Sequence, residues 1–386
     1  MKPHPAAQQG TPEGFKGPTT VLFITTRSDS GTAPKQILEL APLLKSMGIR
    51  VFIASPVNPP YGYEFKKIAD RFIPIPHRDF SFTALWRIRK SIVKHGVKIV
   101  HSHGRNAGVY SRLLSLVTRA SVVHSYHGFP AESGLQGLLK KTIDLLLTKI
   151  RFFPVFTSQT EYQHARSRGL ISDNTDTFII ENAIDPSKFP KRKSTLAPFH
   201  RIDRNNPHTL SHIRIGAVLR AESVRGHEHF LKLAQDAAPF GEWSCIGLSK
   251  ERVERFGSAP TTLEVHGLVN DTKTWLQSLD VFVSTSTSDG QFSTILEAMA
   301  LGTICVVSDI PAHEPFRKHQ AALLFDPSSP KSFSKALGDL RSDKALRDML
   351  IGNAKYMIDR NHDLETFRNK YVDLYRQAAK PGGSTP

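Results

Sequence analysis

One segment, VFVSTSTSDGQFSTILEAMALGTICVVSDI from Val281 to Ile310, constrains the fold more than any other part of the chain. It contains an apolar β-branched run, a polar turn with a glycine, an apolar helical repeat ended by Gly302, and a second β-branched run. This order predicts two parallel strands joined by a helix. The free amides at the start of that helix favour an anionic ligand.

Two acids, Asp289 and Glu297, lie on either side of the start of this helix and are separated by seven residues. Asp289, in the turn, is placed to accept hydrogen bonds from ligand hydroxyls, and Glu297 lies about one turn into the helix on another side of the same ligand. Purely structural roles also fit this spacing, because Asp289 suits a helix cap and Glu297 suits a solvated surface acid.

A second motif, IRIGAVLRAESVRGHEHFLKLA, places Arg220 and Arg225 between an apolar strand and a helix that is expected to begin near Gly226. Guanidinium groups bind a diphosphate through paired hydrogen bonds, although two solvated turn arginines would give the same pattern. The strand-then-helix rhythm repeats between the two motifs and predicts a doubly wound parallel sheet. Such sheets bind ligands beyond the carboxyl ends of their strands, where both motifs fall.

With these motifs the chain resembles family 4 of the retaining glycosyltransferases over roughly residues 19 to 378. LEAMALG, from Leu296 to Gly302, matches the acidic helix motif of that family, and Asp289 stands where a Glu is usual. The resemblance implies an α/β GT-B fold of two Rossmann-like, doubly wound parallel-sheet domains that face each other across a cleft. It also implies transfer with retention of anomeric configuration and no essential metal ion or other cofactor.

The resemblance further implies a role for each candidate residue. Arg220, Arg225, Asp289 and His127 are the expected catalytic group: the arginines bind the donor diphosphate, Asp289 binds the sugar hydroxyls and His127 lies beside the sugar. The arginine pair departs from the usual Arg and Lys, and Asp289 is shorter than Glu, so the hexose stays open. The remaining donor-binding residues are expected to be Gly31, Gly267, Leu268, Gly290, Gln291, Phe292, Ser293 and Glu297, with Glu297 on the ribose.

Other histidines and the two cysteines carry weaker signals. His101, His103 and His124 alternate along two predicted strands and are consistent with packing or orienting roles as well as with a site. They lack closed metal-ligand spacing, so no zinc site is predicted. Cys245 and Cys305 lie in apolar runs and are expected to be reduced core residues.

The length of 386 residues is sufficient for two ordinary domains. Residues 1–18 and 379–386 are expected to be disordered, and no run is apolar enough to span a bilayer. We expect an amino-terminal, acceptor-side domain over 19–186, a linker over 187–212 and a donor-binding domain over 213–360. The helix over 361–378 is expected to pack back on the first domain.

Positive charge is concentrated in the amino-terminal half. Residues 1–200 contain 28 Lys and Arg against 13 Asp and Glu, whereas residues 201–386 contain 23 against 22. This asymmetry predicts an anionic partner such as a membrane surface, contacted through the basic helices in TALWRIRKSIVKHG or LLKKTIDLLLTKIRFF. The alternative is that the apolar faces of both helices only cover the sheet.

These observations predict an enzyme that transfers a hexose from a nucleotide sugar to a hydroxyl of a membrane-associated lipid-linked or polysaccharide acceptor. The usual employment of the family suggests bacterial surface glycan or lipopolysaccharide synthesis, at the cytoplasmic face of the plasma membrane. A GT-B epimerase or a non-catalytic sugar-nucleotide binder would keep much of the same pocket. A nucleic-acid-binding protein is disfavoured, because no motif of that kind is present and the aromatic residues do not alternate with the basic ones.

Overall fold

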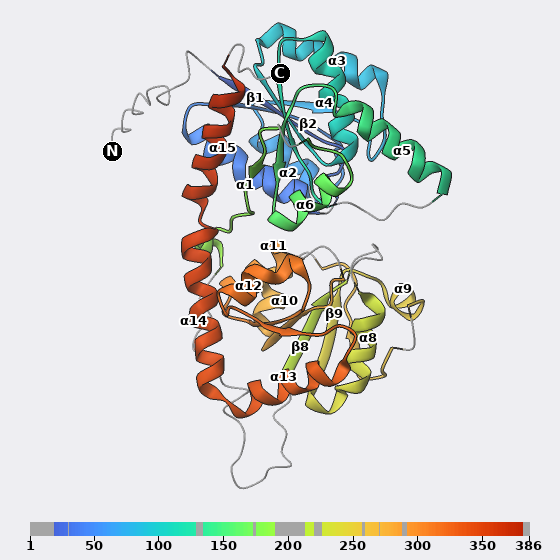
Figure 1. Ribbon diagram of the computed structural model, residues 1–386, viewed down its shortest axis with the longest axis vertical. Coiled ribbons are helices and arrows are strands. Elements are labelled where there is room, and N and C mark those ends of the chain that lie inside the picture. The colour runs from blue at the N-terminus through green and yellow to red at the C-terminus, as the bar shows by residue number, and fades with distance from the viewer. Residues whose placement is uncertain are drawn as a thin grey trace, which may run out of the picture. The chain divides into compact units, whose positions relative to one another are not determined.

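The chain folds into two units, which are shown in a computed structural model in Figure 1. The structure describes residues 19–29, 31–128, 134–172, 175–189, 213–219, 226–256, 259–269, 271–287 and 292–380, with backbone only at 134–140, 292 and 330. One unit comprises Met1–Glu181 and Glu365–Pro386, and the other comprises Asn182–Leu364. The two are described separately below.

The first unit is built on a parallel sheet with the strand order β3-β2-β1-β4-β5-β6-β7. All six residues of β1 are buried, which is expected for a central strand covered by helices on both faces. The strands are β1 (Thr20–Thr25), β2 (Arg50–Ser55), β3 (Arg71–Pro74), β4 (Ile99–His103), β5 (Ser121–Ser125), β6 (Phe153–Phe156) and β7 (Phe178–Ile179).

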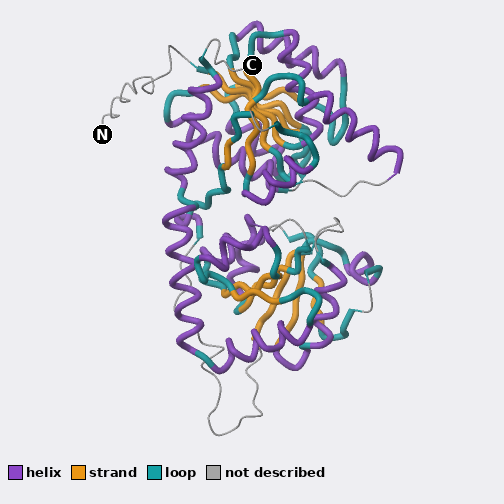
Figure 2. Tube along the Cα trace, viewed as in Figure 1, coloured by secondary structure: helices purple, strands orange, loops and turns teal. Residues whose placement is uncertain are grey.

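Helices connect these strands and cover the sheet (Figure 2). Ser81 caps α3 by accepting a hydrogen bond from the Ala84 amide, and Gly96 ends that helix in the left-handed conformation with φ 62°. The buried side of α3, with Ile88 and Ile92, packs in the same core as Leu22 and Val100 of the sheet. The helices are α1 (Thr32–Ser46), α2 (Tyr61–Ile68), α3 (Phe82–His95), α4 (Arg105–Val117), α5 (Gly134–Leu147), α6 (Gln159–Ser167) and α15 (Leu364–Ala378).

The second unit repeats this design with a parallel sheet of order β10-β9-β8-β11-β12-β13. In both units the chain therefore reverses its direction of winding between the first strand of the sheet and the fourth, as in Rossmann-type sheets. The strands are β8 (Ile213–Val218), β9 (Gly241–Ile246), β10 (Leu263–Val265), β11 (Val281–Ser284), β12 (Ile304–Ser308) and β13 (Leu323–Phe325).

Helices of the second unit include the one predicted after Val281. This helix, α11 (Phe292–Ala300), ends as the sequence predicts: Gly302 has φ 77°, its amide donates to Met299, and the Thr303 amide donates to Ala298. The other helices are α8 (His227–Asp236), α9 (Lys250–Glu254), α10 (Thr272–Ser278), α12 (Glu314–Lys318), α13 (Pro330–Ser342) and α14 (Lys344–Asn361), with short 3₁₀ turns η1 (Pro186–Lys188), η3 (Ala238–Phe240) and η4 (Pro311–His313).

The last helix belongs to the first unit. The phenol of Tyr375 in α15 lies 2.7 Å from Nδ1 of His101, and the phenol of Tyr371 lies 3.5 Å from Oγ of Ser125. Both tyrosine side chains are fully buried, so α15 is a part of the core of this unit rather than an appendage.

Two boundaries differ from the sequence prediction. The chain passes into the second unit after Glu181 rather than at 186, because Ile184 and Phe189 are buried in the core of that unit. The Ile184 amide also donates to the carbonyl of His362, so the return point moves to Leu364 instead of 361. Residues 1–18, 190–212 and 381–386 lie outside the described part of the chain.

Two further predictions concern burial and membrane spans. Cys245 and Cys305 are buried and free, and burial raises the pKa of the Cys245 thiol to about 12. Within the described ranges no helix combines the length and the apolar character needed to cross a bilayer.

Candidate functional site

The two predicted motifs of the second unit meet at the carboxyl edge of its sheet. Gly226, at the start of α8, has φ 63°, and a Cβ built on it would lie 1.8 Å from the carbonyl oxygen of Thr285, just beyond β11. Only glycine fits this approach. The residue after the predicted Arg225 therefore touches the loop that leads to the predicted Asp289.

The neighbouring strand ends are equally close. A Cβ on Gly247, after β9, would lie 2.0 Å from the carbonyl oxygen of Leu219, after β8. The Gly247 amide donates to the carbonyl of Gly267, after β10, at 2.6 Å. The chain segments that lead into Arg220 and Leu268 therefore lie side by side, at the edge where parallel sheets bind their ligands.

Three predicted donor-binding side chains border this edge in the described structure. Glu297 and Ser293 are half-buried on α11, whereas the residues between them are buried in the helix's packing face. Leu268 is 89% exposed, which leaves an apolar side chain uncovered beside Gly267. An uncovered apolar residue at a ligand edge suits the flat face of a base.

The structure does not describe every residue of the predicted set. Phe292 opens α11, but its side chain is outside the description. The others that lie outside the described residues are Arg220, Arg225, Asp289, Gly290 and Gln291. Their predicted roles stay predictions.

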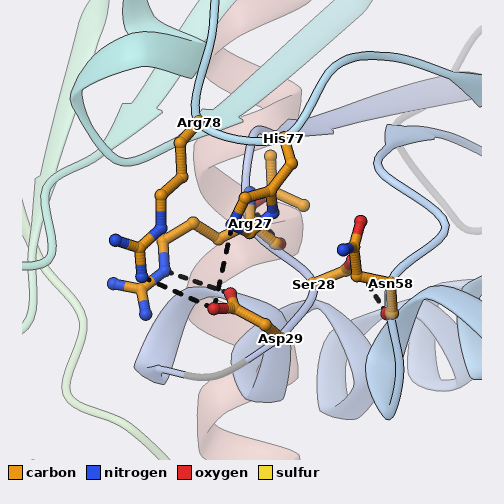
Figure 3. A network of polar contacts seen from close by, with 7 residues as sticks. Arg27, Ser28, Asp29, Asn58, His77 and Arg78 are labelled. Carbon is orange, nitrogen blue, oxygen red and sulfur yellow. Dashed lines mark hydrogen bonds and ion pairs between the residues drawn. The ribbon is translucent and has the colours of Figure 1, made fainter.

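In the first unit, Gly31 begins α1 with φ 108°, and the loop before it is held by a polar network. Figure 3 shows Arg27, His77 and Arg78 directed at the carboxylate of Asp29. Arg27 Nε donates to it at 3.3 Å and Arg78 at 3.4 Å, while His77 lies 3.8 Å away. Burial alone would raise the pKa of Asp29, but Arg27 and the other polar contacts outweigh this effect and lower it.

The loop before α1 is also tied to its neighbours through backbone groups. The Ser28 hydroxyl donates to the carbonyl of Asn58 at 2.9 Å, and the Arg78 amide donates to the carbonyl of Thr26 at 2.8 Å (Figure 3). Arg78 itself has φ 57°, a conformation that non-glycine residues adopt only when their surroundings hold them there. The sequence prediction included Gly31 but missed this network, whose members come from three separate loops.

His127 follows β5 and pairs with His103 at the end of β4. The two rings are stacked with centroids 5.4 Å apart, and His103 Nδ1 lies 3.1 Å from His127 Nε2. Burial lowers the pKa of His127 to about 3 and that of His103 well below its usual value, so both are neutral at pH 7. Nδ1 of His127 and Nε2 of His103 have no hydrogen-bond partner among the described residues.

The other two histidines take orienting roles inside the core. His101 bonds Tyr375 through Nδ1 and Ser125 through Nε2, at 2.7 and 2.8 Å. His124 Nδ1 lies 2.9 Å from the Ser102 hydroxyl. Both histidines use buried polar partners, which agrees with a packing or orienting role.

Beside His127 the first unit contains a pocket that the sequence analysis did not find. Residues of α4 and α5, the end of β5 and the segment after α6 line it, among them Arg105, Arg112, Tyr126, Asp144, Thr148 and Arg168. No local pattern marks this pocket, because Arg112 of α4 is buried against Phe152, a residue far from it in the sequence.

Comparison with known families decides the class of protein. The model described as Glycosyltransferase Family 4 matches residues 33–188, and the model described as Glycosyl transferases group 1 matches residues 214–343. The chain is a family 4, group 1 glycosyltransferase. Its two parallel-sheet domains are the GT-B fold, so the predictions of fold, family and transferase class are confirmed.

Individual relatives are more distant from this glycosyltransferase. It is 34% identical over 93 residues to Glycosyltransferase 1 domain-containing protein 1 of Xenopus tropicalis, a match that covers 24% of this chain and only 26% of that protein. It is 23% identical to the UDP-Gal:alpha-D-GlcNAc-diphosphoundecaprenol alpha-1,3-galactosyltransferase of Escherichia coli, over 79% of this chain and 82% of the relative. Among solved structures, Alr3699/HepE of Anabaena in complex with UDP and glucose has a TM-score of 0.75 and 13% identity, covering 92% of this chain and 99% of that one.

Proposed function

We propose that this glycosyltransferase moves a hexose from a nucleotide sugar to a hydroxyl of a lipid-linked acceptor, with retention of anomeric configuration. The observation that carries the proposal is the convergence at the edge of the second sheet. There the contacts of Gly226 with Thr285 and of Gly247 with Leu219 and Gly267 bring together the segments that lead into the predicted phosphate, sugar and base contacts. The lipid-linked acceptor is suggested by the Escherichia coli relative, whose name includes such an acceptor.

In the proposed chemistry, stabilisation of the charge that develops on the leaving group contributes most to catalysis. When the anomeric bond breaks, negative charge develops on the departing diphosphate, and Arg220, Arg225 and the amides at the start of α11 would stabilise it. Glu297 would hold the ribose, Asp289 the hexose hydroxyls and His127 the hexose. A neutral His127 fits this role, because its Nδ1 has no hydrogen-bond partner among the described residues and can bond a sugar hydroxyl.

Substitution of Glu297 tests the donor site. We expect Glu297→Ala to lower the rate of transfer by about 2 to 4 kcal/mol of transition-state stabilisation, measured as kcat/KM with a radiolabelled nucleotide sugar and a membrane extract. Glu254→Ala is the matched control, because Glu254 is an exposed acid on α9 of the same unit. Turnover near the wild-type rate in the Glu297 variant, with unchanged circular dichroism in both, would contradict the assignment.

A ligand screen identifies the donor. Alr3699/HepE binds UDP and glucose, so UDP sugars are proposed first, and thermal shifts with UDP, GDP and ADP sugars compare the three bases. The assay is run with and without EDTA, because no metal ion is proposed to be essential. Release of nucleoside diphosphate only when acceptor lipid is present supports transfer, whereas isomerised donor without acceptor supports the epimerase alternative.

We also propose that helix α3 brings the enzyme to an anionic membrane surface on the cytoplasmic side. Three large apolar side chains of this helix are uncovered: Phe82 is 78% exposed, Trp86 58% and Val93 62%. Four exposed cations accompany them, Arg87, Arg89, Lys90 and Lys94, and the helix contains no acid.

The exposed apolar and basic side chains of α3 are better accommodated in a lipid headgroup region than in water. A tryptophan places its ring at the level of the headgroups, and each basic residue near anionic lipid contributes about 1 kcal/mol. Helix α5 also exposes Leu146, at 57%, but the side chains of 134–140 are outside the description, so the proposal rests on α3. The first unit would then contact the membrane with its most basic, acid-free helix.

Vesicle flotation of two matched variants tests whether this surface binds the membrane. Trp86 has Lys90 over its ring at 5.2 Å on α3, and Tyr356 has Arg360 over its ring at 5.6 Å on α14, with both aromatics 58% exposed. We expect Trp86→Ala to lower the fraction bound to phosphatidylserine or phosphatidylglycerol vesicles severalfold and Tyr356→Ala to leave it unchanged. Equal binding by both variants would refute the assignment of α3, and tighter binding to DNA than to vesicles at moderate salt would favour the nucleic-acid alternative.

A further inference from the structure

The pocket of the first unit contains a buried guanidinium that has no carboxylate in contact among the described residues. Arg112 is only 4% exposed, although it lines the pocket. Its guanidinium carbon lies 3.9 Å from the ring centre of Phe152, and Nη1 donates to the Gly108 carbonyl at 3.3 Å. Nε is buried and has no hydrogen-bond partner among the described residues.

The polar groups around Arg112 offset its charge only in part: Tyr126 hydrogen-bonds the guanidinium, and Asp144 attracts it from a distance. Asp144, the acid that lines the pocket, is paired with Arg105 at 2.9 Å, and a third arginine, Arg168, also lines the wall. Burial raises the pKa of Tyr126 to about 12, so its phenol is neutral at pH 7. Among the described lining residues Asp144 is the acid of this wall, and a buried charge without a carboxylate in contact costs several kcal/mol.

The packing shows that this arrangement is specific. A Cβ on Gly108 would lie 2.8 Å from Cε1 of His124 and 3.0 Å from Nη1 of Arg112. Glycine at this position of α4 therefore lets the His124 ring and the guanidinium approach the helix together. A stacked, positioned guanidinium is the form in which arginine recognises phosphate groups.

We propose that this pocket binds a phosphate or diphosphate anion through Arg112, with Arg168 assisting from the wall. On the basis of the proposed function, we assign that anion to the diphosphate of the lipid-linked acceptor. His127 and Gly128 line the same pocket. An acceptor anchored here by its diphosphate would present the hydroxyls of its attached sugar next to the residue proposed to contact the donor hexose.

Direct binding of pyrophosphate is the first test. A saturating nucleoside diphosphate is added to occupy the donor site, and the thermal shift and calorimetric Kd for inorganic pyrophosphate are then measured. We expect Arg112→Met and Arg168→Gln each to weaken pyrophosphate binding on the order of tenfold to a hundredfold, as for loss of a hydrogen bond to a charged group. Arg119→Gln is the matched control, because Arg119 is an exposed cation after α4 that does not line the pocket.

Kinetics with two acceptors is the second test and separates the lipid source from a free anion. The same acceptor sugar is offered as a diphospholipid and as an uncharged alkyl glycoside. The wild type is expected to have a KM at least tenfold lower for the diphospholipid, and this preference is expected to collapse in Arg168→Gln and in any folded Arg112→Met, while Arg119→Gln retains it. Loss of pyrophosphate binding with an unchanged acceptor preference would leave the anion site but overturn its assignment to the acceptor.

The outcomes distinguish this inference from the proposed function. If the wild type transfers sugar and both pocket variants keep full pyrophosphate binding, the inference falls and the proposed function stands. If the wild type transfers sugar to neither acceptor, but both variants lose pyrophosphate binding, the anion site stands and the proposed function falls. Should Arg112→Met fail to fold, the Arg168→Gln variant, at a half-buried position, decides the outcome of both measurements.

Discussion

The two units share one topology but differ in what they place at the carboxyl edge of the sheet. In the first unit, strands β4 and β5 contain the buried, neutral histidines His101, His103 and His124, and the half-buried His127 follows β5. In the second, β11 and β12 end in the small hydroxyl residues Ser284, Thr285, Ser286 and Ser308, all buried. The same parallel frame therefore supports two chemistries, which are decided by a few residues after each strand.

Backbone packing differs in the same way. At the helix that follows the first strand of each unit, Gly226 before α8 meets the carbonyl oxygen of Thr285, whereas the Cβ position of Gly31 before α1 faces open space. Close backbone approach leaves room for a phosphate-bearing ligand above the helix start. In the first unit side chains occupy this edge, and the buried tyrosines of α15 hydrogen-bond to His101 and Ser125.

The largest predicted effect tests this contrast at two glycines. We expect Gly226→Ala to destabilise the protein by roughly 4 kcal/mol, because its Cβ meets the Thr285 carbonyl and its φ is positive. Gly31→Ala should cost about 1 to 3 kcal/mol from backbone strain alone. Urea unfolding measures both, and equal losses would show that close packing does not distinguish the two edges.

Acid should weaken the first unit before the second. The four histidines of the first unit have pKa values lowered by burial, so below about pH 6.5 the unfolded chain binds protons that the folded unit does not. Between pH 7 and 6 the free energy of unfolding then falls by at most about 0.7 kcal/mol per histidine, or about 3 kcal/mol for the set.

Hydrogen exchange at several pH values, corrected for intrinsic rates, locates this acid effect. In the second unit burial lowers the pKa of His313 to about 4, and this histidine by itself contributes about 0.7 kcal/mol to the loss over the same range. Protection should decline first in β4, β5 and α15. Simultaneous loss of protection in both units would contradict the comparison.

The smallest predicted effect concerns the partly exposed acids of the two units. Asp29→Asn removes the carboxylate shared by Arg27, His77 and Arg78 and should cost no more than about 1 kcal/mol at pH 7. Because the pKa of Asp29 is lowered, its contribution should fade as the pH drops through that pKa, below about 3.8. Asp309→Asn, which removes an exposed pair with Arg317, is the control and should cost less; a larger loss there would contradict the network's importance.

The sequence was sufficient to predict the fold because the signals for it are local. Apolar runs, helical periods and Gly302 fix strands, helices and their ends through contacts a few residues apart, and the structure contains the predicted helix after β11. The boundary was placed five residues late because the burial of Ile184 and Phe189 depends on residues far along the chain. Packing between residues that are far apart in the chain produces no periodic pattern in the nearby sequence.

The same distinction between local signals and distant packing applies to the residues of the two candidate sites. The sequence by itself determined the acidic helix motif, the glycines at strand ends and His127, since each belongs to a short contiguous pattern. Only the tertiary structure decided that Asp29 gathers cations from two loops, that α3 leaves Trp86 uncovered, and that Arg112 is buried beside Phe152. Those contacts join residues up to 49 positions apart, and such proximity is set by how strands and helices stack rather than by the order of the residues.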